Sequence, residues 1–234
     1  MKIKGLIFDL DGVLVDTKKI HFDALNVALK SVKFDQVSFK DHIDIYDGLP
    51  TLEKLKILNK KKGLNKKFFL KIQKAKQIQT QKLLNKNLKF NPKIFKLFSK
   101  LSKNYKICIA TNAVNKTLQV CLKKLKIKKF ISFSFSNEDV KNNKPHPEIY
   151  LKCLINMCLK PSETLIFEDS HHGVLAAQDS GCILHTVKDI SDINSSKINL
   201  IINNLNRTNM TKNKLNFWSD QSLNILIPMA GAGS

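Results

Sequence analysis

The first eleven residues constrain the fold more than any other segment. Residues 3–8 form an apolar run that leads directly into Asp9 and Asp11. The run is continuous rather than alternating, which is typical of a parallel strand buried on both faces. Because side chains on an extended backbone repeat every two residues, Asp9 and Asp11 can point into one crevice. Open α/β sheets bind ligands beyond the carboxyl ends of such strands, so this position is predicted to be catalytic and to attract a cation.

After residue 92 the pattern alternates between helix and strand. Helices are predicted to end near residues 103 and 125 and to cover residues 147–158 and 173–179, with strands at residues 106–110, 131–135, 164–167 and 182–187. Such alternation indicates a parallel sheet with helices on both faces. The predicted fold class is therefore α/β, with a Rossmann-like core.

Between the first and second predicted strands the pattern is helical. Residues 18–31, 52–59 and 68–84 carry apolar side chains at spacings of three and four, among many lysines and glutamines. No convincing strand interrupts them. The sequence therefore predicts an all-helical insertion after the first strand.

The chain is strongly basic, with a net charge of +21 over 234 residues. Arg207 is the only arginine among 40 basic residues, whereas base readout in nucleic acids relies heavily on arginine. Nucleic acid is therefore not the expected partner. The excess of lysine is expected to attract small anionic, phosphorylated metabolites.

Membrane insertion and secretion are not expected. No apolar stretch reaches the roughly 20 residues that a membrane helix needs, and Asp9 and Asp11 interrupt the N-terminal candidate for a signal sequence. The five cysteines, an odd number without CxxC spacing, are predicted to be reduced core residues. The expected location is the cytoplasm.

Four segments together resemble a known family. Residues 8–17 are similar to motif I of the haloacid dehalogenase superfamily, in its branch of small-molecule phosphatases and β-phosphoglucomutase. Residues 107–112, 144–147 and 165–170 resemble motifs II, III and IV, in the order of that family. A single DxD pair is weak evidence, but four matches in the family's order are specific to it. The resemblance covers residues 1–190.

The resemblance implies a domain organisation. Residues 1–16 and 89–190 are expected to form the Rossmann-like catalytic core, and residues 17–88 a helical cap with hinges near residues 15–18 and 89–92. Such a lid excludes water and selects the substrate. Residues 191–222 are expected to be a terminal core segment that fades into a linker.

The resemblance also implies the chemistry. Asp9 would be the nucleophile that forms an aspartyl phosphate, and Asp11 the general acid and base, with a pKa raised by a desolvated setting. The presence of Asp11 argues against a dehalogenase, because a halide leaves without a proton and so needs no general acid. Mg²⁺ would be held by Asp9, the backbone carbonyl of Asp11 and Asp169, while Glu168 would bind the metal directly, act through water or only orient its neighbours.

Other residues are expected to hold the phosphate. Thr111, Asn112 and Lys144 would bind its oxygens, although Thr111 could instead cap the following helix and Lys144 could be an ordinary surface lysine. His171 and His172 follow motif IV and are expected to be exposed or to cap a helix rather than to bind metal.

Three cap residues are expected to face the substrate: His21, Gly48 and Thr51. His21 could equally have a packing role. β-Phosphoglucomutase carries an arginine where this chain has Thr51, so hydrolysis of a sugar phosphate is favoured over a mutase, unless a cap lysine such as Lys76 substitutes. The alternatives are a β-phosphoglucomutase-like phosphosugar mutase and a non-catalytic binding module.

The last residues carry a separate resemblance. Residues 223–234 are similar to the first strand and glycine-rich loop of sugar nucleotidyltransferases. They could begin a fused nucleotidyltransferase domain beyond residue 234, or they could be an apolar tail with a glycine-rich end.

Overall fold

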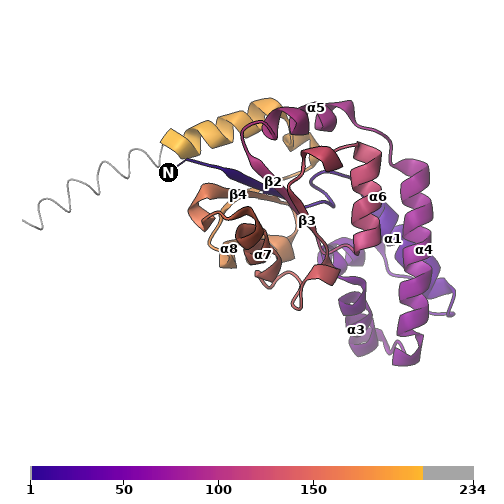
Figure 1. The fold of residues 1–234 in the computed structure, drawn as a ribbon. Helices are drawn as coiled ribbons and strands as arrows, with labels where there is room; N and C mark the ends of the chain where they lie inside the picture. The colour runs from indigo at the N-terminus through magenta and orange to yellow at the C-terminus, as the bar shows by residue number, and fades with distance from the viewer. Residues whose placement is uncertain (1, 208–234) are drawn as a thin grey trace, which may run out of the picture.

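The computed structural model describes residues 2–207, which form a five-stranded sheet with helices around it (Figure 1). All strand pairs are parallel, and the strand order is β3-β2-β1-β4-β5. The strands are β1 (Gly5–Phe8), β2 (Lys106–Ala110), β3 (Phe133–Phe135), β4 (Thr164–Glu168) and β5 (Ile183–Thr186). The predicted α/β fold class is confirmed.

The register brings the polar strand ends together. Phe8, the last residue of β1, lies opposite Ile109 of β2 and Phe167 of β4. The residues that follow these three strands therefore emerge at one edge of the sheet. The order also places β1 at the centre, where the chain changes direction across the sheet, and this is where α/β folds bind ligands.

The sheet is buried on both faces, as the continuous apolar run predicts. Phe8 belongs to one apolar cluster and its neighbour Ile7 to the other. Helices α5 (Pro92–Leu101) and α6 (Asn115–Leu125) contribute to the first cluster, and α7 (Glu148–Met157) and α8 (His171–Asp179) to the second. Within the first cluster the rings of Phe8 and Phe167 stack at 4.7 Å between centroids.

The segment between β1 and β2 builds a third apolar cluster of its own. Its main helices are α1 (Lys18–Lys30), α3 (Thr51–Lys62) and α4 (Phe69–Asn87), and none of the described residues 17–88 lies in a strand. Leu25, Leu55 and Ile72 are fully buried where these helices meet. The helical character of the insertion is therefore confirmed, while its role as a cap stays a prediction.

Several short elements and one longer helix are not among the elements predicted from the sequence. Short helical turns are α2 (Phe39–Asp41), η1 (His42–Tyr46), η2 (Lys66–Phe68), η3 (Lys128–Phe130), η4 (Asn137–Asp139), η5 (Pro161–Glu163) and η6 (Ile190–Asp192). The strand expected at residues 131–135 is shorter, and residues 195–207 form a helix within residues 191–222, the expected terminal core segment and linker. Residues 223–234 lie outside the described residues.

The helix at residues 195–207 packs on the core beside the start of β1 (Figure 1). Ile198 and Ile202 are buried in the same cluster as Phe8, and the Ile3 amide donates to Asn206 Oδ1 at 3.0 Å. The asparagine-rich composition hides these apolar positions, which recur at helical spacing. The core therefore continues beyond residue 190.

Cysteine burial differs from the prediction at one position. All five cysteines are free thiols, and four of them are buried, but Cys158 is exposed. Cys158 follows the last residue of α7 as its C-cap, in a left-handed conformation with φ of 52°, and so lies outside the regular helical turns that bury Cys153. None of the described helices has the length and apolarity to cross a membrane.

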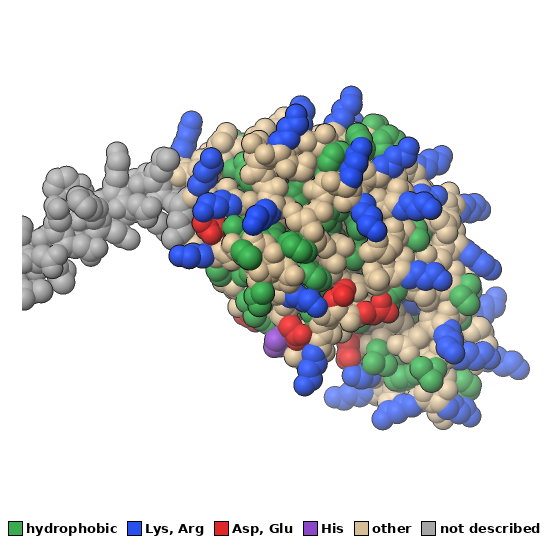
Figure 2. Space-filling view, in the orientation of Figure 1, with side chains coloured by type: hydrophobic (Ala, Val, Ile, Leu, Met, Phe, Trp, Pro, Cys, Tyr) green, Lys and Arg blue, Asp and Glu red, His purple; other side chains and the backbone are tan. Residues whose placement is uncertain are grey.

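Charge is unevenly distributed on the surface. Figure 2 shows lysine and arginine side chains spread over the whole face in view, whereas acidic side chains are few and most of them lie near one another. The basic character of the chain is therefore carried on the outside of the molecule.

The insertion also buries a histidine. His42 is fully buried, its ring packs against Phe22 at 5.5 Å, and neither ring nitrogen has a hydrogen-bond partner among the described residues. Burial lowers the pKa of His42 to about 4, and the charge of Lys54 acts in the same direction. A proton on this ring is therefore costly in the folded state.

We expect Ile198→Ala to lower the free energy of unfolding by about 2–5 kcal/mol, because it leaves a cavity in the core. Leu200→Ala on the same helix is the matched control, since Leu200 is 61% exposed, and should change the free energy of unfolding by less than about 0.5 kcal/mol. Chemical denaturation measures both. Equal effects of the two substitutions would contradict the packing of this helix.

We expect the free energy of unfolding to fall as the pH falls, because the unfolded chain protonates His42 near pH 6.5 and the folded chain only near 4. This histidine should contribute a loss of about 2 kcal/mol between pH 8 and pH 5. Denaturation of His42→Phe at both pH values should show that much less pH dependence, whereas His146→Gln, at an exposed histidine, should not. An unchanged slope in His42→Phe would contradict this assignment.

Candidate active site

A cavity of about 340 Å³ lies at the carboxyl edge of the sheet and is lined by both parts of the chain. The sheet side contributes Asp9, Asp11, Thr111, Asn112, Lys144 and Asp169, and the helical insertion contributes His21, Gly48, Thr51, Lys54, Lys76 and Thr80. The predicted site residues therefore meet around one cavity, except Glu168, which lies behind its wall. The volume is at the small end of the ~300–1,000 Å³ range of small-molecule sites.

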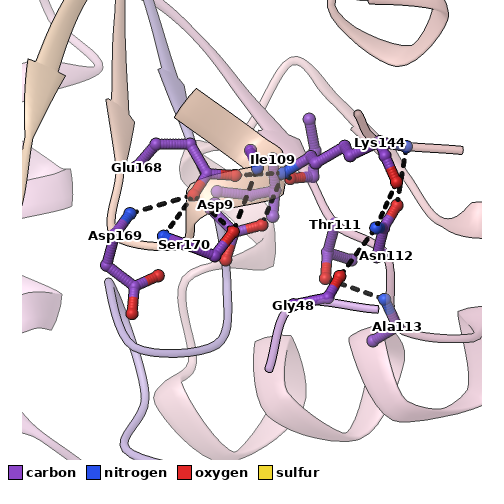
Figure 3. A network of polar contacts seen from close by, with 12 residues as sticks. Asp9, Gly48, Ile109, Thr111, Asn112, Ala113, Lys144, Glu168, Asp169 and Ser170 are labelled. Atoms are coloured by element: carbon purple, nitrogen blue, oxygen red, sulfur yellow. Dashed lines mark hydrogen bonds and ion pairs between the residues drawn. The ribbon is translucent and has the colours of Figure 1, made fainter. Parts of the chain in front are cut away.

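Asp9 follows β1 and is almost completely buried, with 7% of its surface exposed. Its backbone amide donates to Phe167 O at 3.0 Å, which ties it to the neighbouring strand, and its Oδ1 lies 2.7 Å from Lys144 Nζ (Figure 3). Burial raises the pKa of Asp9 well above its ordinary value, while the charge of Lys144 opposes this rise. Asp9 is thus nearly buried and paired with the ammonium group of Lys144.

Lys144 is a buried lysine with three acceptors. Its Nζ donates to Asp9 Oδ1, to Glu168 Oε1 at 2.6 Å and to Ala110 O at 2.9 Å. Burial alone would lower the pKa of Lys144, but the charges of Asp9 and Glu168 raise it by more than burial lowers it. The side chain therefore stays charged. Because only 3% of Lys144 is exposed, the alternative of an ordinary surface lysine is wrong.

Glu168 is fully buried at the end of β4, and both its oxygens have partners. Oε1 accepts from Lys144 and from the Tyr150 hydroxyl at 2.9 Å, and Oε2 accepts from the amides of Asp169 and Ser170. A Cβ at Gly173 would lie 1.8 Å from Oε1, so only glycine fits there. These contacts tie Glu168 to Lys144 and to the loop after β4.

Asp9, Glu168 and Asp169 form a cluster that could hold a metal ion. One carboxylate oxygen from each lies within 4.8 Å of the others. Asp169 Oδ1 is buried without a hydrogen-bond partner among the described residues, and its other oxygen lies 3.0 Å from Lys18 Nζ. Three carboxylates, one of which has an oxygen without a hydrogen-bond partner among the described residues, are hard oxygen donors of the kind that fits Mg²⁺.

The surroundings of Asp169 change its pKa and leave space for its carboxylate. Burial raises the pKa of Asp169 to about 6, against the opposing hydrogen bond and charge of Lys18. Gly12, with φ of +86°, lies so close that a Cβ there would be 2.0 Å from Asp169 Oδ2. The glycine after Asp11 therefore makes room for the acid after β4.

Asp11 differs from Asp9 in its setting. Its Oδ1 accepts from the Thr17 hydroxyl and lies 3.2 Å from His21 Nε2. Burial acts to raise the pKa of Asp11, but His21 and Thr17 together outweigh it, and the pKa lies below the ordinary value. Desolvation therefore acts as expected, but the expected net rise in the pKa of Asp11 does not occur, because the first turn of the insertion supplies hydrogen bonds to it.

Thr111 and Asn112 follow β2. Thr111 Oγ1 accepts from the Ala113 amide at 3.0 Å, but α6 begins after Val114 and no side chain caps it, so the alternative of a cap for this helix is wrong. Asn112 donates to Gly48 O at 2.8 Å and accepts from the Lys144 amide at 3.2 Å. Asn112 thus joins the sheet edge to the loop of the insertion that carries Gly48 and Thr51.

The two histidines after β4 are not metal ligands in the cluster described above. His171 is exposed, and α8 is capped by Ser170, whose hydroxyl accepts from the Gly173 amide. A capping role for either histidine is therefore wrong, whereas exposure of His171 is confirmed.

Sequence reasoning missed several residues that complete the site. Thr17 binds Asp11, Lys18 pairs with Asp47 as well as with Asp169, and Tyr150 supports Glu168. Lys54 lines the cavity although it is one of many lysines. The one available signal was Thr17, which stands six residues after Asp11 within the segment that resembles motif I.

Comparisons with known proteins agree with this geometry. The family model of haloacid dehalogenase-like hydrolases matches residues 6–187. A phosphorylated carbohydrates phosphatase of Thermotoga maritima is 29% identical over 199 residues, which cover 80% of this chain and 88% of that protein. A pyrophosphatase of Bacillus cereus is 27% identical over 193 residues, or 77% of this chain and 81% of that protein.

A solved structure shows the same fold. β-Phosphoglucomutase from Clostridium difficile superposes with a TM-score of 0.73 over 86% of this chain and 98% of that one, at 23% identity.

We expect Lys144→Met to lower the free energy of unfolding by about 3–5 kcal/mol, because it leaves Asp9 and Glu168 buried without their cation. Lys141→Met, at an exposed lysine nearby, is the control for the loss of one positive charge. Chemical denaturation of both variants measures the difference. A Lys144→Met protein as stable as the control would show that the buried carboxylates do not need this lysine.

Proposed function

The chain belongs to the haloacid dehalogenase-like hydrolase family, and from this premise we propose that it is a Mg²⁺-dependent phosphatase acting through an aspartyl-phosphate intermediate. Its substrate is a small phosphorylated metabolite, and we favour a sugar phosphate. The observation that carries the proposal is the buried Asp9, paired with Lys144 and facing a small cavity together with Asp11 and Asp169.

The named relatives support this reaction class. One is named as a phosphatase of phosphorylated carbohydrates and another as a pyrophosphatase, and both names describe cleavage of a bond to phosphorus. The shared step would be attack on a phosphoryl group. The small cavity favours a single metabolite over a polymer.

Asp9 would act as the nucleophile. Lys144 binds one of its oxygens, which fixes the carboxylate and leaves the other oxygen for attack on phosphorus. Lys144 Nζ also donates to Glu168 and lies over the ring of Tyr150. These contacts would keep the ammonium group beside Asp9 throughout the reaction. Thr111 would bind the phosphoryl oxygens from the neighbouring strand end.

Asp11 would give a proton to the leaving oxygen and later take one from water. Thr17 and His21 hold its Oδ1, so the second oxygen is directed toward the substrate. A phosphate dianion brought next to Asp11 raises its pKa by repulsion, which offsets the lowering by His21. The same carboxyl can then serve as acid first and as base afterwards.

Asp9, Asp169 and Glu168 are the residues that would hold Mg²⁺, with Glu168 acting directly or through its neighbours. The bound ion would supply positive charge against the repulsion between Asp9 and the phosphate.

Residues 17–88 would act as the cap over this site. Asn112 ties the loop at Gly48 to the sheet edge, and α1 brings His21 onto Asp11, so the insertion contacts the chemistry directly. Thr51 lines the cavity and carries no charge, which favours net hydrolysis over a mutase that must hold two phosphates in turn.

We expect Asp9→Asn to lower phosphate release at least ~10³-fold, because the amide cannot attack phosphorus. Release is measured from a panel of sugar phosphates, pyrophosphate and p-nitrophenyl phosphate with Mg²⁺. Chelation of the metal with EDTA should abolish release from the wild type, and added Mg²⁺ should restore it. Asp35→Asn, at an exposed acid, is the control and should keep full activity.

Two results would contradict the proposal. Phosphate release that survives in Asp9→Asn would exclude the aspartyl phosphate. Absence of release from the whole panel, together with conversion of glucose 1-phosphate to glucose 6-phosphate in the presence of a bisphosphate primer, would assign the protein as a mutase.

A further inference from the structure

Acidic residues are absent from a long stretch of the chain. Residues 54–137 contain 24 lysines and no aspartate or glutamate, whereas the other 150 residues contain all 19 acids and 16 of the basic residues. Within the part of the chain that the structure describes, no lysine from residue 66 to residue 137 forms an ion pair. The positive charge is therefore concentrated in one segment, and such asymmetry suggests a nucleic acid or a membrane as a partner.

Most of this segment gathers on one side of the molecule. It includes α4, α5 and α6, and α6 packs against both of the other helices (Figure 1). In the space-filling view the surface over α5 and α6 carries lysine side chains, and the acidic side chains in view lie away from it (Figure 2). The lysines of these helices therefore share one basic side.

Three phenylalanine rings form a row on this side. The rings of Phe90 and Phe95 lie 5.7 Å apart between centroids, and those of Phe95 and Phe130 lie 5.3 Å apart. Phe90 is 44% exposed, and the other two are half-buried. The row joins the residues before α5, α5 itself and the turn η3, which follows α6. Rings exposed side by side in this way are a candidate interaction site.

Lysine ammonium groups lie against the same rings. Lys126 Nζ is 5.1 Å from the centroid of Phe90. Lys129 Nζ is 5.2 Å from the centroids of both Phe95 and Phe130. Both lysines are exposed. Aromatic surface and positive charge therefore occur at the same points, and we call this group the ring-lysine face: Phe90, Phe95, Phe130, Lys126 and Lys129.

We propose that the ring-lysine face binds single-stranded nucleic acid, with bases stacked on its rings and phosphates held by its ammonium groups. A nucleotide supplies both partners in one unit, because every base has an aromatic face and every linkage carries a negative charge. The near absence of arginine argues against the reading of a base sequence, but stacking and backbone contacts do not need arginine. The binding is therefore independent of base sequence, and it does not rest on the proposed phosphatase function.

Fluorescence anisotropy tests the proposal with a labelled single strand of mixed sequence and a duplex of the same length. Charge alone favours the duplex, which has the higher charge density, whereas stacking needs unpaired bases. The single strand should bind at least about 5-fold more tightly than the duplex, the worth of one weak stack. A duplex that binds as tightly as the single strand would overturn the proposal.

Phe90→Ala tests the stacking. It should weaken binding of the single strand by about 5- to 150-fold, the worth of one stacked base. Phe39→Ala is the matched control, because Phe39 is a 51% exposed ring on the helical insertion, and it should change the dissociation constant less than about 2-fold. The melting temperatures of both variants show that they are folded. Equal effects of the two substitutions would contradict stacking on this face.

The double variant Lys126→Gln, Lys129→Gln tests the phosphate contacts without removing a ring. It should reduce the slope of log affinity against log salt concentration by about 1.4, the effect of two lost contacts to a single strand. Lys30→Gln with Lys40→Gln removes the same charge from two exposed lysines of the insertion and should change the slope by less than half as much. The same reduction in both double variants would assign the binding to general charge and overturn the ring-lysine face.

A sedimentation experiment with vesicles of phosphatidylserine and phosphatidylcholine examines the other partner that a basic surface can have. The wild type should bind the single strand, and its ring-lysine variants should bind these vesicles as the wild type does. Vesicle binding that is lost in Lys126→Gln, Lys129→Gln, together with no binding of the single strand by the wild type, would overturn the proposal and assign the face to a membrane surface.

Discussion

The buried ammonium group of Lys144 is the interaction on which the site depends. It joins the side chain after β1, the last residue of β4 and the carbonyl that ends β2, through Asp9, Glu168 and Ala110. Lys144, which lies in a loop outside the sheet, thereby holds the ends of three adjacent strands together. Two buried carboxylates this close would repel each other without it, and removal of one partner of such a group costs far more than the pair gains.

The sheet could be predicted from the sequence because its strands are buried on both faces. Continuous apolar runs such as residues 3–8 and 164–167 are typical of buried parallel strands, and both runs form central strands of the sheet. The turns at residues 39–46 could not be predicted in the same way, since three residues of α-helix followed by a π-helical turn leave no periodicity. Ser38, whose hydroxyl accepts from the Asp41 amide, was the one local signal.

The site could be predicted in part, because a parallel sheet places the carboxyl ends of its strands at one edge. Ends of neighbouring parallel strands meet at one edge, so Asp9, Thr111 and Asp169 had to lie close together. Lys18 and Lys54 were not predictable, because nothing in a chain with 40 basic residues distinguishes a lysine that pairs with a site acid or is buried from an ordinary exposed one. Burial is a property of the packed helices, and so is the direction of the pKa shift at Asp11, which depends on where α1 places His21.

The lysines of this basic chain act in two different places, on the surface of the molecule and inside the cavity. The lysines spread over the surface in Figure 2 form a diffuse field that draws anions of any kind toward the molecule, and salt screens it over about 8–10 Å. Inside the cavity Lys144 is already paired with two carboxylates and adds little attraction. Lys54 and Lys76 also line the cavity and are nearly buried, and the charge of Asp11 opposes the lowering of the pKa of each by burial, so these two lysines add positive charge close to the acid that follows β1.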